Sequence, residues 1–267
     1  MKLARLQPSL ISASPSRWES QEAPPVSFAV LEGEVAWEID GPYAAQRHKT
    51  GRSWPLADVR LLPPIEPTKI VCVGRNYRDH AAELNNPIPA EPIIFLKPPS
   101  SLIGPEEPIL IPAISKRVDF EGEIAAVMGR VCARLGEDES AAPYLLGYTC
   151  LNDVTARDLQ KADGHFTRAK GFDTFCPLGP LIETDFDIAA ATVTTRVNGQ
   201  QRQFGRTADM MFCVDVIIRW VSRVMTLAPG DVIATGTPAG VGPLAVGDIV
   251  DVTVPGIGTL RNPVARA

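Results

Sequence analysis

A segment near the middle of the chain places two carboxylates in an apolar run that is typical of a buried β-strand. Residues 119–128 read DFEGEIAAVM. Side chains alternate between the two faces of a strand, so Glu121 and Glu123 are expected to point the same way, with only glycine between them. Two neighbouring carboxylates repel each other unless a positive charge lies between them, and a divalent cation is the simplest such charge. The segment therefore predicts two ligands of a metal site.

Asp153 is the candidate for a third ligand. It follows the apolar run 144–151, at the point where a buried strand is expected to reach the rim of the protein. Three carboxylates without histidine or cysteine favour Mg²⁺ or Mn²⁺ over zinc, and they leave about three of the six octahedral positions for water or a chelating substrate. The sequence thus predicts a catalytic Mg²⁺ or Mn²⁺ site on Glu121, Glu123 and Asp153. The alternative for the two glutamates is a solvated strand with alternating acids.

His80 and Glu83 are the candidates for acid-base chemistry. They lie three residues apart in a predicted helical stretch, 75–84, so the carboxylate can hold the imidazole. A histidine held in this way can remove a proton from water while the acid stabilises the imidazolium. The alternative is a surface contact within one helix. His48 and His165 have no comparable setting, although His165 is a candidate to line a pocket.

Two further segments carry candidate residues for anion binding. Lys170 lies among small and apolar residues, where it could supply a fixed positive charge to an enolate or carboxylate; the alternative is a loop lysine that reaches solvent. The segment 235–243 is rich in glycine but lacks the Gly-Lys-Ser/Thr of a P-loop, which disfavours nucleotide binding. Its backbone amides and the Thr237 hydroxyl are still candidates to hold a small carboxylate.

Composition excludes several classes of partner. The chain has 267 residues, a net charge of −5 and no dense block of lysine or arginine, so nucleic acid is not expected as a partner. No apolar run approaches the ~20 residues that cross a bilayer, and the N-terminus lacks a hydrophobic signal core. We therefore expect a cytoplasmic protein without a membrane partner. The five cysteines form no Cys-x-x-Cys pair and are expected to be reduced core residues.

The pattern along the chain predicts a small domain followed by a large one. Residues 27–39 contain two short strand-like runs around a glycine turn, and the proline-rich segment 61–67 follows them. We place a small N-terminal β-rich domain at residues 1–65 and the main domain at 66–267. Several short strands and one long amphipathic helix, 208–227, are predicted in the main domain. This is a β-rich α+β pattern without the regular alternation of strands and helices of a doubly wound sheet.

Six motifs in order along the main domain resemble the fumarylacetoacetate hydrolase family, in its short bacterial form with an abbreviated N-terminal domain. They are GRNYRDH (74–80), FLKP (95–98), DFEGE (119–123), NDVTARD (152–158), KGFD (170–173) and GTP (236–238). The resemblance runs from about Lys69 to the C-terminus and does not include the first 65 residues. It implies the family's mixed β-sandwich-like roll, which is usually a homodimer.

The resemblance also implies roles for individual residues. It places Mg²⁺ or Mn²⁺ on the same three carboxylates, and His80 and Glu83 on a mobile lid over the metal. Lys170 and Gln160 would face the oxygens of a small keto-acid substrate, whose carboxylate would be received by Thr237 and the Arg75 loop. Tyr77 and Arg157 would complete the substrate-binding residues.

The resemblance implies metal-dependent chemistry on a keto acid. The leading hypothesis is hydrolysis of a carbon–carbon bond in an acylpyruvate-type 2,4-diketo acid, as in aromatic catabolism, with His80 activating a water and with the metal and Lys170 stabilising a pyruvate enolate. The alternatives on the same site are decarboxylation of an oxaloacetate-like acid and isomerisation of a 2-hydroxy-diene dicarboxylate. A non-catalytic carboxylate-binding module is the hypothesis from another class. The motifs alone do not choose between these reactions.

Overall fold

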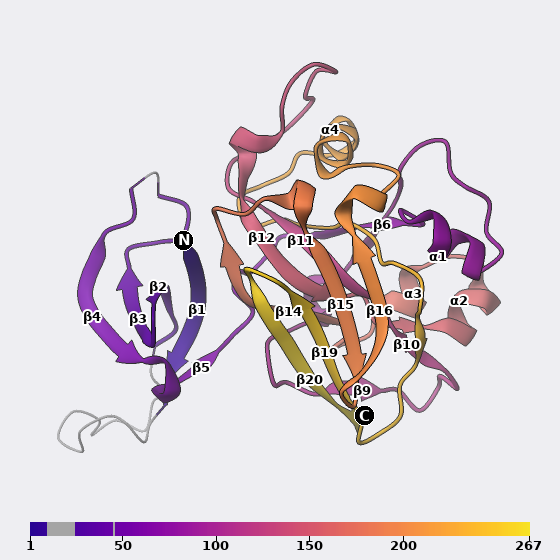
Figure 1. Cartoon of the computed structure of the whole chain (residues 1–267), viewed down its shortest axis with the longest axis horizontal. Helices are drawn as coiled ribbons and strands as arrows, with labels where there is room; N and C mark the ends of the chain where they lie inside the picture. Colours follow the sequence, from indigo (N-terminus) through magenta and orange to yellow (C-terminus); the bar gives the residue numbers. More distant parts are fainter. Residues whose placement is uncertain (10–24, 45) are drawn as a thin grey trace.

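The structure is a computed structural model, and it describes residues 1–9, 25–44 and 46–267. Strands make up most of its regular structure, and the helices within the described ranges are few (Figure 1). Within these ranges, the strands form one sheet of twelve strands, a second of five and a third of three. The predicted β-rich α+β class is therefore confirmed.

The twelve-stranded sheet has the order β4-β3-β2-β1-β14-β12-β11-β17-β6-β7, with β5 paired to β1 and β8 paired to β14. Its strands from the first 65 residues are β1 (Lys2–Pro8), β2 (Ser27–Glu32), β3 (Val35–Ile39), β4 (Lys49–Pro55) and β5 (Val59–Leu61). The others are β6 (Ile70–Gly74), β7 (Ile93–Lys97), β8 (Leu102–Ile103), β11 (Gly122–Met128), β12 (Leu145–Asn152), β14 (Cys176–Glu183) and β17 (Val232–Ala234).

The N-terminal strands lie to one side of the molecule and are joined to the rest through β1 (Figure 1). The hairpin predicted within residues 27–39 is present, because β2 and β3 pair in antiparallel fashion on either side of Gly33. Strand β1 pairs with β2 on one edge and with β14 on the other, where Leu3 lies opposite Ile182. The two parts of the chain thus share one sheet, and the domain boundary at residue 65 stays a prediction.

A five-stranded sheet packs against the large one. Its strands are β9 (Ile109–Ile111), β15 (Thr192–Val197), β16 (Gln200–Arg206), β19 (Ile249–Val254) and β20 (Gly258–Arg266). The small third sheet contains β10 (Val118–Phe120), β13 (Thr155–Ala156) and β18 (Gly242–Pro243). The α-helices are α1 (Arg78–Glu83), α2 (Arg157–Asp163), α3 (Thr167–Lys170) and α4 (Val214–Val224). Figure 1 shows α1, α2 and α3 on the same side of the molecule.

Strand β11 runs through the centre of the core and is buried on both faces. Ile124 and Ala126 face a cluster that includes residues of β15, β19 and α4, whereas Ala125 and Val127 face a second cluster on the other side of the sheet. Burial on both faces explains why the strand reads as a continuous apolar run rather than an alternating one. Any carboxylate on this strand is therefore removed from water.

The predicted long helix 208–227 is too long at its N-terminal end, because α4 begins only at Val214. The two residues Met211 and Phe212 ahead of α4 are instead bound by Asn76. The Asn76 side-chain amide donates to the Phe212 carbonyl over 3.0 Å, and its oxygen accepts from the Phe212 N–H over 2.8 Å. The Met211 N–H also donates to the Asn76 carbonyl. These bonds use backbone groups that a helix would need internally, and they tie the chain ahead of α1 to the core.

Two further expectations can be compared with the structure. All five cysteines are free, and four of them are buried as predicted, whereas Cys213 is exposed. Within the described ranges, no helix is long and apolar enough to cross a membrane. The predicted homodimer and cytoplasmic location stay predictions.

Candidate active site

The three predicted carboxylates lie together although 32 residues of sequence separate the first from the last. Glu121 lies at the break between β10 and β11, Glu123 lies on β11, and Asp153 directly follows β12. Strands β11 and β12 are antiparallel neighbours, and the Asp153 N–H donates to the Glu121 carbonyl over 2.8 Å. All three side chains are buried, and each offers a carboxylate oxygen within 4.8 Å of the others. The predicted convergence is confirmed.

Close packing requires the glycine between the two glutamates. A Cβ atom at Gly122 would lie 2.0 Å from the Thr195 hydroxyl oxygen on β15 and 3.3 Å from the Val252 side chain on β19. The segment from Glu121 to Glu123 therefore rests directly on the five-stranded sheet. A residue with a side chain at position 122 would lift the two glutamates away from Asp153.

Three basic side chains compensate two of the acids. Lys170 Nζ lies 2.8 Å from Glu121 Oε2 and 2.6 Å from Asp153 Oδ2, and Lys97 Nζ lies 2.7 Å from Asp153 Oδ1. Arg157 pairs with Glu121 and also with the buried Asp119. Burial alone would raise the pKa of Glu121, but the charges of Lys170 and Arg157 outweigh burial and lower it. Burial likewise opposes the charge of Lys170, and Asp153 and Glu121 raise its pKa.

Glu123 is different because no basic side chain in the described part of the chain forms an ion pair with it. Its Oε2 accepts a hydrogen bond of 2.7 Å from the Gly236 N–H. Burial, followed by the charges of Asp153 and Glu121, raises the pKa of Glu123 well above its ordinary value. A buried carboxylate beside two others is stabilised by a hard dication with oxygen ligands, so this donor set fits Mg²⁺ or Mn²⁺.

Lys97 is a member of the site that the sequence analysis did not assign. Its side chain is fully buried and also donates to the Val154 carbonyl over 3.2 Å. Removing one partner of a buried ion pair leaves the other charge uncompensated. The signal in the sequence was a lysine at the end of an apolar strand, in the motif FLKP. A lysine buried at such a position needs an acidic partner to compensate its charge.

Lys97→Met is expected to lower the free energy of unfolding by about 3–5 kcal/mol, because Asp153 loses a buried counter-charge. Urea denaturation in the presence of a chelator measures this change. Lys116→Met is a matched control, since Lys116 is exposed. A loss no larger than that of the control would mean that Lys170 alone compensates Asp153.

His80 and Glu83 form the predicted pair on α1. His80 Nδ1 lies 3.3 Å from Glu83 Oε2, and His80 is buried with 6% of the residue's surface exposed. Glu83 also accepts hydrogen bonds from the Gly240 N–H, over 3.1 Å to Oε1 and 3.2 Å to Oε2. The imidazole is thus held by a carboxylate that is itself anchored to the glycine-rich segment. This arrangement leaves Nε2 of His80 as the ring nitrogen for proton transfer.

A cavity of about 400 Å³ joins these groups. The three carboxylates, His80 and Lys170 all line it, so a small molecule in the cavity would contact acids, imidazole and ammonium together. Arg75, Lys161 and His165 also line it. Arg75 adopts a left-handed backbone conformation, with φ of 59°, at the exit of strand β6.

The other predicted substrate-binding residues have varied positions. Arg157, Gln160 and Thr237 line the cavity, and Arg157 Nη1 donates to Gln160 Oε1 over 2.7 Å. The Thr237 hydroxyl donates to the Gly122 carbonyl over 2.9 Å, so its hydrogen is used within the protein. Tyr77 does not line the cavity; its side chain is buried and its hydroxyl has no hydrogen-bond partner among the described residues. The substrate-binding roles stay predictions.

Comparison with known proteins identifies the family. Residues 69–265 match the family model described as fumarylacetoacetate (FAA) hydrolase C-terminal. The chain belongs to the fumarylacetoacetate hydrolase family. Residues 20–64 match a second model, described as Rv2993c-like, N-terminal. The resemblance stated from the motifs is therefore confirmed.

Relatives within the family have several names. Protein Rv2993c of Mycobacterium tuberculosis is 52% identical over 252 residues, covering 90% of this chain and 94% of that protein. The mitochondrial oxaloacetate tautomerase fahd2 of Xenopus laevis is 44% identical over 221 residues, covering 78% of this chain and 69% of that protein. The crystal structure of 2-hydroxyhepta-2,4-diene-1,7-dioate isomerase from Mycobacterium marinum is 50% identical with a TM-score of 0.86, covering 100% of this chain and 98% of that one.

Proposed function

We propose that the protein is a divalent-metal-dependent isomerase that moves a proton within a 2-oxo dicarboxylate or its enol. One observation carries the proposal: the carboxylate cluster of Glu121, Glu123 and Asp153, the His80 imidazole and two cationic side chains that form no ion pair among the described residues all line one small cavity. The names of the relatives, an oxaloacetate tautomerase and a diene-dioate isomerase, support the same reaction class.

The two unpaired cations favour a substrate with a second carboxylate. Arg75 and Lys161 line the cavity, and no acidic side chain of the described residues forms an ion pair with either of them. The acids of the cavity are gathered in the carboxylate cluster. A dicarboxylate could therefore place one end at the cluster and the other near these cations, where its charge is compensated.

The chain supplies a residue for each requirement of proton transfer. Glu121, Glu123 and Asp153 would hold Mg²⁺ or Mn²⁺, and the bound cation would supply a Lewis acid for the oxygens of a 2-oxo acid. The Nε2 atom of His80 takes a proton from the carbon next to the keto group and returns it to the enolate oxygen or to a distal carbon, so no proton is gained or lost. Glu83 stabilises the imidazolium during this exchange, and Lys170 places a positive charge beside the developing enolate.

Hydrolysis of an acylpyruvate-type 2,4-diketo acid is the second candidate. A specific observation favours it, because a buried histidine braced by a carboxylate can equally remove a proton from water. Both reactions pass through a stabilised enolate, and they differ in whether water attacks a carbonyl carbon. Decarboxylation of an oxaloacetate-like acid forms the same enolate, but it needs neither removal of a carbon-bound proton nor attack by water.

A substrate panel tests the proposal. We expect the wild-type protein with Mn²⁺ to convert the enol of oxaloacetate or a 2-hydroxy-diene dicarboxylate. Conversion should be at least about 10-fold faster than that of the matching monomethyl ester, because the ester loses roughly 1.4 kcal/mol of charge compensation. Proton NMR in D₂O follows the carbon-bound proton, and a chelator should stop the exchange. Faster cleavage of acylpyruvates would instead establish a hydrolase, and tight oxalate binding without any turnover would establish a binding module.

A further inference from the structure

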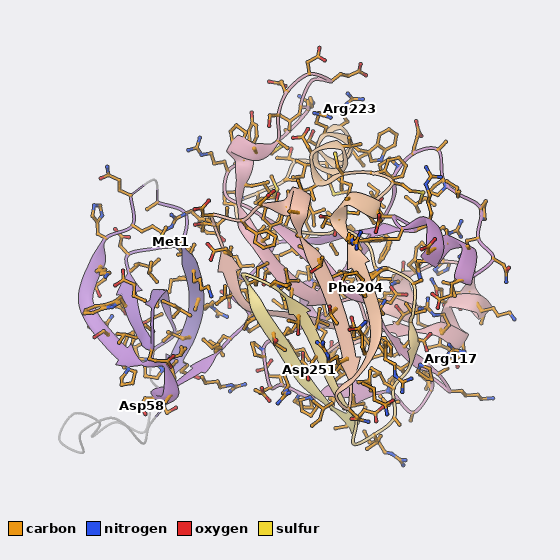
Figure 2. The ribbon with its side chains drawn as sticks, viewed as in Figure 1. Met1, Asp58, Arg117, Phe204, Arg223 and Asp251 are labelled. Carbon is orange, nitrogen blue, oxygen red and sulfur yellow. The ribbon has the colours of Figure 1, made fainter. Side chains whose placement is uncertain are left out.

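Gln203 is a buried polar residue that neither the motifs nor the proposed mechanism uses. It lies on β16 with 1% of its surface exposed. Its neighbour Phe204 is 50% exposed and lies on the outer side of the same strand, as Figure 2 shows. Because side chains alternate along a strand, Gln203 points inward, toward the segment that carries the two glutamates.

The amide of Gln203 joins two parts of the active site. Its Oε1 accepts a hydrogen bond of 3.0 Å from the N–H of Gly122, the residue between the two glutamates. Its Nε2 donates to the Thr237 hydroxyl over 2.7 Å and to the Pro238 carbonyl over 2.8 Å. One acceptor and two donors are therefore all engaged, which fixes the side chain in one orientation.

The segment 236–240, which we call the glycine loop, continues from these contacts to α1. At its start, the Gly236 N–H donates to Glu123. At its end, the Gly240 N–H donates to Glu83, the partner of His80. The glycine loop thus contacts a cluster carboxylate at one end and the carboxylate that orients His80 at the other.

The glycine loop is seated directly on β16. Gly240 has φ of +101°, and a Cβ atom there would lie 2.2 Å from the carbonyl oxygen of Arg202, the residue before Gln203. Only glycine tolerates both this conformation and this close approach. A shift of the strand or of Gln203 is therefore transmitted to Gly240 and from there to Glu83.

We propose that Gln203 is a positioning residue that couples the carboxylate cluster to the His80–Glu83 pair through the glycine loop. Gln203 does not line the cavity, and it acts by holding Gly122 and the loop at a fixed separation. Its effect on turnover rests on the proposed function, whereas its effect on the position of α1 does not.

Gln203→Met tests the coupling, because methionine is of similar length but has no amide. The matched control is Gln201→Met, an exposed glutamine on the same strand. We expect hydrogen exchange of the amides of Ala81 on α1, of Leu84 directly after α1 and of Gly240 to become faster in Gln203→Met and to stay unchanged in the control. Exchange in β11 beyond the site should be the same in both, which separates this effect from global destabilisation.

Turnover supplies the second readout. We expect kcat to fall about 10- to 100-fold in Gln203→Met, as for residues that orient catalytic groups. In the His80→Ala background the same substitution should cost less than about 3-fold, since a residue that acts through His80 has no effect once His80 is gone. If the wild-type protein turns over none of the tested acids, the proposed function fails and the exchange measurement still decides the coupling.

Thr237→Val provides an independent route if Gln203→Met does not fold. It removes the hydroxyl through which the glycine loop binds Gln203, and the same faster exchange of α1 is expected. Unchanged exchange of α1 in the folded variant would overturn the proposal. An equal loss of kcat with and without His80 would overturn it as well.

Discussion

Glu123→Gln is expected to lose at least about 10³-fold in turnover while the metal-free protein becomes more stable than the wild type. Activity falls because the variant has one charged ligand fewer, which lowers the affinity of the site for a dication. Stability rises because the substitution removes one of the three buried acids of the carboxylate cluster, the one that has no ion pair in the described structure. Gly236 still finds an acceptor, since the amide oxygen of glutamine can take its N–H. Calorimetric Mn²⁺ titration and thermal unfolding measure the two effects.

The stabilisation should depend on pH in a definite direction. The pKa of Glu123 is raised in the folded state, so its protonation supports the fold fully below the unfolded value of about 4.5, and this support is lost as pH rises through the folded pKa. In chelator, the gain in Tm of Glu123→Gln over the wild type should therefore be small near pH 4.5 and should grow toward pH 8. Glu34→Gln, at an exposed glutamate, is the control. If the gain in Tm instead became smaller as pH rises, Glu123 would not be a carboxyl group with a raised pKa in the folded protein.

His80→Ala is expected to lower turnover by about 10²- to 10⁴-fold, the usual contribution of a positioned general acid or base. Metal binding should change little, because His80 is not one of the three carboxylates that form the candidate metal site. Added imidazole should restore part of the activity, since the cavity would then have room for a free base where the side chain was. Steady-state kinetics with and without imidazole measure both effects.

Two histidines serve as controls for His80. His165→Ala removes an imidazole that lines the same cavity but forms no ion pair with an acid of the described residues, and His48→Ala removes one at an exposed position in the N-terminal part. Neither should change the proton-transfer rate by more than a few-fold. If His165→Ala were as damaging as His80→Ala, the base would be misassigned. If His80→Ala abolished acylpyruvate cleavage but spared decarboxylation, water activation would be its main role.

Several elements of the site were predictable from sequence because their signals are local. Glu121 and Glu123 are two residues apart in a segment with a strand pattern, so their proximity was predictable from strand geometry, although Glu121 lies at the break between β10 and β11. His80 and Glu83 are three residues apart on a helix, and their contact follows in the same way. Asp153 was found from its position after a buried strand, although its pairing with Glu121 depends on β11 and β12 being antiparallel neighbours.

Other elements had no local signal. Lys97 appeared in a motif but without a role, because its partner Asp153 lies 56 residues away. Gln203 lies in a run of polar residues, QQRQ at 200–203, where nothing distinguishes the one buried glutamine from its exposed neighbours. The start of α4 was placed too early because the amphipathic stripe extends into residues whose backbone is bound by Asn76.

By itself, the sequence determined the β-rich class, the family, the three acids and the His80–Glu83 pair, since each depends on residues close together along the chain or on an ordered set of motifs. Only the tertiary structure decided how these groups are balanced: which lysines compensate which acids, why Glu123 has no ion pair among the described residues, and which groups Gln203 and the glycine loop contact. The physical reason is that charge compensation and hydrogen bonding in a core depend on distances of a few ångströms between segments that the chain brings together only when its sheets pack.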